Sequence, residues 1–292
     1  MAIAAGLVYS AEVVSGAAAI ILLYTVVLKN KEFKQWWAFR IMLQMGALDG
    51  LMLAAAFISA LQNLMNLQLP HLFNLISVLI LSVVPDVQCL LNIPLAISRL
   101  AAGVPLPALD RTRYYAVAIG LAWLLGAVYI AGFVVTAVGA SFEYDFDEHN
   151  YILNLISRSY SEWRQILSIV QMVNSIICCI ITAVIYGVLL IIIGYKKQSF
   201  PPQIRIILEA IIPLTIVIVE RMGLLFMHSL ETVLGNYTSV VSHSLLFLQP
   251  VIRVISQLVF NKTFRTKTHE LFVKPKPPGY GTRMYGDLTD DD

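Results

Sequence analysis

The chain has 292 residues, of which 58% are hydrophobic and only 13% are charged, with a formal net charge of +2. This composition is too apolar for a soluble domain, which must cover its surface with polar side chains. The solvent of such a chain is the lipid bilayer.

Long apolar stretches follow one another along the whole chain. An α-helix needs about 20 mainly apolar residues to cross the hydrocarbon core of a bilayer. Seven stretches meet this requirement, so the predicted fold class is an all-α membrane protein, a seven-transmembrane helix bundle over residues 1–260. The predicted spans are residues 3–28, 38–61, 72–101, 114–138, 164–194, 204–228 and 239–260.

Lys and Arg fall almost entirely in alternate connections between these spans. The first, third and fifth connections and the tail are basic, whereas the fourth connection is rich in Asp and Glu. Because short basic loops stay in the cytoplasm, we expect the N-terminus outside and the C-terminus inside. No Lys or Arg precedes Lys29, so the first span is expected to be an uncleaved signal anchor. Residues 274–292, which are rich in Pro and acidic at the end, are expected to form a disordered cytoplasmic tail.

Polar residues recur at helical spacing within three of the predicted spans. These stripes predict faces that look into the bundle, because polar side chains are costly against lipid. Two interpretations remain open: the stripes line a wet or ligand-filled cavity, or they hydrogen-bond one helix to another. Their members are Ser77, Gln88, Asn92 and Arg99; Gln171, Ser175, Cys178 and Thr182; and Ser239, His243, Arg253 and Gln257.

Several ionisable residues lie at membrane depth, where each needs a partner or water. Asp49 and Arg253 lie at comparable depth, so we expect them to pair or to share a water network, with a structural role favoured over a functional one. Asp86 lies about 200° around its helix from Gln88, which predicts that it faces away from the polar stripe. It is therefore only a minor candidate for ligand binding.

The outer half of the bundle is the predicted ligand site. Glu220 and Arg221 are adjacent in the sixth span and cannot face each other, so each needs another partner or a hydrated cavity. An alternative is that both satisfy neighbouring helices. The candidate ligand-binding residues are Gln88, Asn92, Gln171, Ser175, Glu220, Arg221, His228 and His243.

The sequence contains no pattern typical of an enzyme. It has no metal-binding His/Cys spacing, no phosphate-binding glycine loop and no nucleophile elbow. The seventh span has no lysine that could form a Schiff base with retinal. All three cysteines fall inside spans, so no extracellular disulfide is expected. We expect no enzymatic activity, no cofactor, no metal and no nucleic-acid partner.

Short landmarks in the predicted order carry a family resemblance. They are Met45-Gly46-Ala47-Leu48-Asp49, Leu95-Ala96-Ile97-Ser98-Arg99-Leu100, Trp123, Pro213, Gln249-Pro250 and Phe260-Asn261-Lys262-Thr263-Phe264-Arg265. The chain resembles rhodopsin-like G-protein-coupled receptors and, more narrowly, the serpentine chemoreceptors of nematodes. It departs from that pattern at Ser98, where an acid is usual, at Arg253, where a tyrosine is expected, and in lacking the usual extracellular cysteine pair.

The resemblance implies a chemosensory receptor that binds a small extracellular molecule. Its expected location is the plasma membrane, including the membrane of sensory cilia. The resemblance also implies coupling to a heterotrimeric G protein through Arg99, Arg111, Lys196 and Lys197, although the basic loops could instead contact membrane lipid. It further implies a short amphipathic juxtamembrane helix over residues 261–273. The implied structural switch consists of Asp49, Trp123, Pro213, Pro250 and Arg253. The alternatives are a seven-helix transporter or channel that uses buried carboxylates, or a non-signalling membrane protein.

Overall fold

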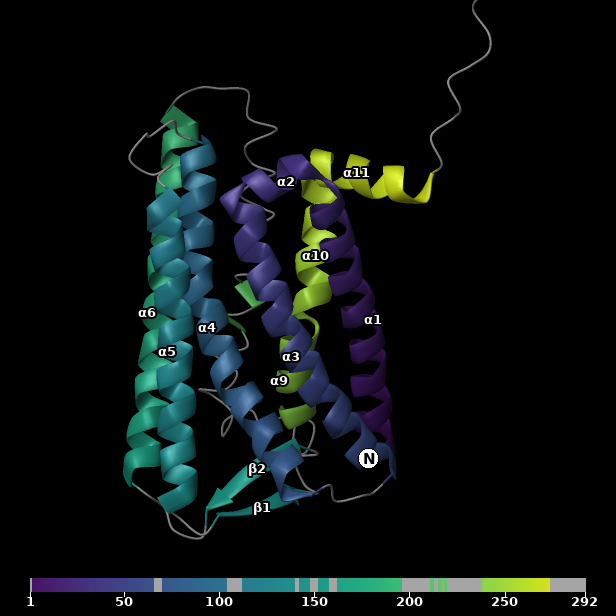
Figure 1. The fold of residues 1–292 in the computed structure, drawn as a ribbon, viewed down its shortest axis with the longest axis vertical. Coiled ribbons are helices and arrows are strands. Elements are labelled where there is room, and N and C mark those ends of the chain that lie inside the picture. The colour runs from purple at the N-terminus through teal and green to yellow at the C-terminus, as the bar shows by residue number, and fades with distance from the viewer. Residues whose placement is uncertain are drawn as a thin grey trace, which may run out of the picture.

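Five long helices dominate the structure (Figure 1). The structure is a computed structural model that describes residues 2–65, 70–103, 112–139, 142–147, 152–157, 162–195, 211–212, 215–216, 218–219 and 238–273. Each of the five long helices contains a stretch long and apolar enough to cross a membrane. They match the first five predicted spans, and the largest shift is at the end of α3, which runs on from the predicted Leu61 to Met65. They are α1 (Ala2–Lys29), α3 (Trp37–Met65), α4 (His71–Gly103), α5 (Thr112–Gly139) and α6 (Glu162–Tyr195).

The seventh predicted span is divided into two helices. Helix α9 (Thr238–Phe247) and helix α10 (Gln249–Phe260) are separated at Leu248. Pro250 lies in the first turn of α10, and its missing N–H removes a hydrogen bond that would make one continuous helix. Most of the sixth predicted span lies outside the described residues, so a total of seven spans stays a prediction.

Two short helices accompany the bundle. Helix α2 (Lys31–Gln35) lies in the first connection, which the sequence analysis treated only as a basic loop. Helix α11 (Lys262–Phe272) follows α10 and falls within the 261–273 segment. The Asn261 side chain caps α11 by accepting a hydrogen bond from the backbone N–H of Phe264, at 3.0 Å. The predicted disordered tail, residues 274–292, lies outside the described residues.

A two-stranded antiparallel sheet corrects the expectation that the fold is entirely helical. Strand β1 (Phe142–Asp147) pairs with β2 (Ile152–Ser157), and both lie between α5 and α6 in the chain. Aromatic and acidic residues alternate along β1, which is the period of a strand. The sequence analysis considered only the acidic charge of this connection and therefore missed the strand.

The elements define two ends of the bundle (Figure 1). We call the end with the beginning of α1, the two strands and the beginning of α9 the hairpin end. The opposite end, with α2 and α11, is called the basic end because its elements include Lys31, Lys34, Lys262, Arg265 and Lys267. Helix α4 packs against α3, α5 and α6, and α1 packs against α3, α9 and α10.

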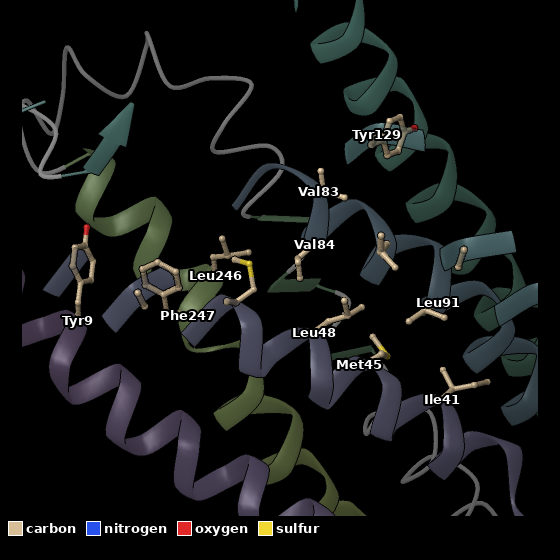
Figure 2. Close-up of a cluster of buried hydrophobic side chains, with 14 of the residues drawn as sticks. Tyr9, Ile41, Met45, Leu48, Val83, Val84, Leu91, Tyr129, Leu246 and Phe247 are labelled. Carbon is tan, nitrogen blue, oxygen red and sulfur yellow. The ribbon is translucent and has the colours of Figure 1, made fainter. Parts of the chain in front are cut away.

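Buried apolar side chains form two main clusters. The larger one joins α1, α3, α4, α5 and α9, with Met45, Leu48 and Leu91 at its centre (Figure 2). The other, at the basic end, includes Phe33 on α2, Phe39 on α3 and Phe264 on α11; the ring centroids of Phe33 and Phe39 are 4.3 Å apart. The apolar side chains left exposed are numerous on α5 and α6, where they suit contact with lipid tails.

Candidate functional site

A buried ion pair lies at the centre of the described bundle. The Arg253 guanidinium on α10 donates through Nη1 to Asp49 Oδ2 on α3, and both side chains are buried. Gln88 Nε2 on α4 donates to the other oxygen, Asp49 Oδ1, at 2.7 Å. We call Asp49, Gln88 and Arg253 the central cluster. The predicted pairing of Asp49 with Arg253 is confirmed, and Gln88 joins it.

This arrangement satisfies both carboxylate oxygens of Asp49. A carboxylate buried away from water is costly unless it is paired and hydrogen-bonded. Here one oxygen receives a cation and the other an amide N–H, so three helices are tied together at one point. The cluster lies close to the break between α9 and α10, since Arg253 is in the first turns of α10.

A second polar contact joins α4 to α6. The Ser175 hydroxyl donates to Asp86 Oδ1 at 2.6 Å, and both residues are buried. Gln171, one turn earlier on α6, donates through Nε2 to the backbone carbonyl of Ser82 at 3.5 Å. Asp86 thus lies on a different face of α4 from Gln88, as predicted, but that face is also buried.

The burial of Asp86 has a geometric cause. Helix α4 has neighbours on several sides, with α3 on one and α6 on another. Gln88 faces Asp49 on α3, while Asp86 faces Ser175 on α6. Two faces about 200° apart on α4 are consequently both buried.

A third polar group lies in the hairpin half of the bundle, between α1 and α9. The Glu12 side chain on α1 is 5% exposed, and the Ser244 hydroxyl on α9 is its hydrogen-bonding partner. Tyr9, one turn earlier on α1, is fully buried, and its ring meets that of Phe247 edge-on with centroids 5.5 Å apart. Figure 2 shows Tyr9 beside Phe247 on α9. We call Tyr9, Glu12 and Ser244 the α1–α9 polar group.

The sequence analysis named none of this group as a site residue. The available signal was the spacing of Tyr9 and Glu12, which places both on one face of α1. A carboxylate in an otherwise apolar span was the second signal. A further contact at the hairpin end was also missed, in which Gln62 Nε2 on α3 donates to Asn74 Oδ1 on α4 at 3.0 Å.

The predicted ligand residues are distributed over separate parts of the bundle. Gln88 and Ser175 contact different partners, and Asn92 is only partly buried on α4. His243 is partly buried on α9, with its ring centroid 6.3 Å from that of Phe247. Gln171 contacts the Ser82 carbonyl on α4, and Glu220, Arg221 and His228 lie outside the described residues.

At the basic end, Arg99 is buried against α3. Its Nη2 lies 3.8 Å from Met42 Sδ. The other predicted coupling residues, Arg111, Lys196 and Lys197, lie outside the described residues, as does Pro213. Trp123 is 38% exposed on α5, so it lies at the edge of the helix packing and not within a buried cluster. Pro250 is buried at the start of α10.

The described parts of the chain contain no group of three His, Cys, Asp or Glu side chains that could hold a metal ion. Comparison with solved structures finds squid rhodopsin, with a TM-score of 0.68 over 93% of this chain and 85% of that one. The chain has a rhodopsin-like fold. At 12% sequence identity the likeness is one of fold alone. No family model and no curated protein sequence matches the chain. In this rhodopsin-like fold the central cluster fastens α3 and α4 to α10.

Proposed function

We propose that this protein is a G-protein-coupled receptor for a small extracellular molecule. The observation that carries the proposal is the likeness to squid rhodopsin over 93% of the chain. The narrower proposal, a chemosensory receptor, is supported by the landmark residues that resemble nematode serpentine chemoreceptors. The partners are a small-molecule ligand, a heterotrimeric G protein and membrane lipid.

The proposed orientation has the hairpin end outside and the basic end in the cytoplasm of a plasma-membrane protein. It is supported by the cations of α2 and α11, since basic connections stay inside. Epitope tags at the two ends of the chain test it in intact cells. The N-terminal tag is stained without permeabilisation and the C-terminal tag only after it, whereas staining of an external C-terminal tag contradicts the topology.

The ligand binds in the hairpin half of the bundle and favours one packing of the helices over another by binding it more tightly. The central cluster provides a link for this change, because Arg253 connects the helix that follows the break at Leu248 to Asp49 on α3. A shift of α9 therefore changes the geometry of the contact between Arg253 and Asp49, which holds α10 against α3. In this proposal Gln88 belongs to the link, while Asn92 and His243 contact the ligand.

The G protein binds at the basic end. Arg99 lies near that end of α4, and the proposed surface also includes Arg111, Lys196 and Lys197. In the described packing Arg99 is buried against Met42, so this arrangement represents the resting receptor. Coupling requires Arg99 to leave Met42 and become accessible to the G protein.

A transporter or channel is the second candidate, favoured by the buried carboxylates Glu12, Asp49 and Asp86. A proton or ion path needs exchangeable groups that follow one another across the membrane. Asp49 is instead neutralised by Arg253, and Asp86 is bonded to Ser175 on another side of α4. Because Asp49 and Asp86 are held by separate partners, they do not form such a succession, and this favours the receptor over the transporter or channel.

Nucleotide exchange on G proteins in membranes from expressing cells tests the proposal. Wild-type protein with an activating ligand from a screen of small metabolites is expected to accelerate exchange, and Arg99→Ala at equal surface level is expected to abolish the acceleration. Arg40→Ala is the matched control, because Arg40 is an exposed cation of the same end whose guanidinium bonds the Lys34 carbonyl and lies over the Trp37 ring. An equal loss in both variants contradicts the specific role of Arg99.

A further inference from the structure

Among the residues that the structure describes, no cation pairs with the buried carboxylate of Glu12. Its side chain is 5% exposed, and Ser244 is its hydrogen-bonding partner. Its second oxygen, Oε2, has no hydrogen-bond partner among the residues that the structure describes. Burying a carboxylate in this way is costly, and a nearby cation removes much of the cost. Asp49 shows the satisfied arrangement in the same bundle, with one oxygen on Arg253 and one on Gln88.

The Tyr9 hydroxyl, on the same face of α1, also lacks a hydrogen-bond partner among the described residues. Tyr9 is fully buried. It precedes Glu12 by three residues, and the two groups are close enough for the charge of Glu12 to act on the hydroxyl. The two residues thus lie one helical turn apart on α1, and each carries a buried oxygen with unused acceptor capacity. An ammonium group has three N–H donors and a positive charge, which suits both oxygens.

Access and charge at the hairpin end agree with a cationic ligand. Ser244, the hydrogen-bonding partner of Glu12, is only partly buried. The sequence of β1 contains three acidic residues, Glu143, Asp145 and Asp147. The strand lies at the same end of the bundle as the beginnings of α1 and α9 (Figure 1). Negative charge at one end of a protein raises the local concentration of cations there.

We propose that the α1–α9 polar group binds the protonated amine of a small organic ligand, with Glu12 as the counter-ion and the Tyr9 hydroxyl as a second hydrogen-bonding group. This inference deepens the proposed function, because it names the chemical class of the ligand and places its charged end between α1 and α9. It rests on the receptor being a ligand-binding protein, but it does not depend on coupling to a G protein.

Ligand-induced thermal stabilisation of the purified full-length protein tests the inference. The probes are primary alkylammonium and arylalkylammonium ions, including 2-phenylethylammonium, each compared with the matched neutral alcohol, such as 2-phenylethanol. A ligand that binds only the folded protein raises the melting temperature Tm. At least one amine is expected to raise Tm of the wild type at concentrations where its alcohol does not.

Glu12→Gln keeps the side-chain volume and can still accept the Ser244 hydrogen bond, but it removes the charge. We expect it to weaken apparent amine binding by about 10- to 100-fold, the usual range for a lost hydrogen bond to a charged group. Tyr9→Phe keeps the ring against Phe247 and removes only the hydroxyl, so a loss of about threefold to tenfold is expected. Thr25→Ala, in the basic-end half of the same helix, removes a hydroxyl that bonds the helix's own Ile21 carbonyl, at 2.7 Å; it is the matched control and keeps wild-type amine binding.

Several outcomes overturn the inference. They are equal stabilisation by amines and alcohols, no stabilisation by any amine, and unchanged amine binding in both Glu12→Gln and Tyr9→Phe. If Glu12→Gln does not fold, Tyr9→Phe alone decides between the outcomes. A protein that binds amines as expected but never accelerates nucleotide exchange contradicts the proposed receptor function and leaves the amine site standing.

Discussion

Arg253 and Asp49 are 204 positions apart in the chain, yet the guanidinium of one contacts the carboxylate of the other inside the bundle. The contact joins α10 to α3, and the amide of Gln88 on α4 completes it. Because the pair is buried, its two members depend on each other more than a surface pair would. Loss of one member is therefore expected to lower the free energy of unfolding more than loss of both.

Removal of Arg253 alone is predicted to destabilise the protein strongly. Arg253→Met leaves Asp49 buried without a cation, which costs about 3–5 kcal/mol in the free energy of unfolding. The double variant Asp49→Asn with Arg253→Met has no buried charge at this point and should recover most of that loss. Thermal unfolding of the purified variants in detergent measures both effects. Additive losses in the double variant would show that the two residues are not coupled.

Gln88→Leu is predicted to cost about 1–3 kcal/mol, because Asp49 Oδ1 loses its 2.7 Å hydrogen bond while it stays buried. Asn92→Leu, one turn later on the same helix and only partly buried, should change the unfolding free energy by no more than about 0.5 kcal/mol. The comparison uses the same unfolding assay. Equal effects of the two substitutions would argue against the contact with Asp49.

Two glycines of α5 are predicted to respond in opposite directions to alanine. A Cβ atom at Gly126 would lie 2.6 Å from Val87 Cγ2 on α4, and the β-branched Val87 is buried and stiff, so Gly126→Ala should destabilise by about 1–3 kcal/mol. A Cβ atom at Gly120 meets no atom within 4 Å, so Gly120→Ala should stabilise by up to about 1 kcal/mol. If Gly120→Ala destabilised the protein as much as Gly126→Ala, the result would contradict the packing of α5 on α4.

The aromatic side chains at the basic end are predicted to hold α11 against α2 and α3. Phe264 is fully buried, and its ring centroid lies 6.2 Å from that of Phe33. Phe264→Ala should therefore cost about 3–5 kcal/mol and increase proteolysis within α11. Phe272→Ala, at a position 76% exposed on the same helix, is the control and should leave both properties unchanged.

Much of the helical framework could be predicted from the sequence, because a bilayer demands about 20 consecutive apolar residues per helix. The pairing of Asp49 with Arg253 could also be predicted, since two opposite charges at similar depth have few other ways to avoid exposure to lipid. The break at Leu248 could not be located in this way. Apolar composition is continuous across it, and the effect of Pro250 on the preceding turn is local.

The site residues were harder to predict, for reasons of packing. A helical wheel assumes that one face looks inward, and α4, which has neighbours on several sides, violates that assumption at Asp86. The sequence patterns predicted no site residue on α1, because the stripe criterion requires several polar residues on one helix. The significance of Glu12 depends on the absence of a second partner for Oε2 in the described packing, which no single-helix pattern contains.

The most direct test of the central claim uses purified components. The full-length protein is reconstituted into liposomes with a purified heterotrimeric G protein, and GDP release is measured with and without the amine that gives the largest thermal stabilisation. The account predicts that this amine accelerates GDP release from wild type and that Arg99→Ala removes the acceleration. Proton or ion flux through liposomes that contain the protein alone, with no effect on GDP release, would contradict the account and favour a transporter or channel.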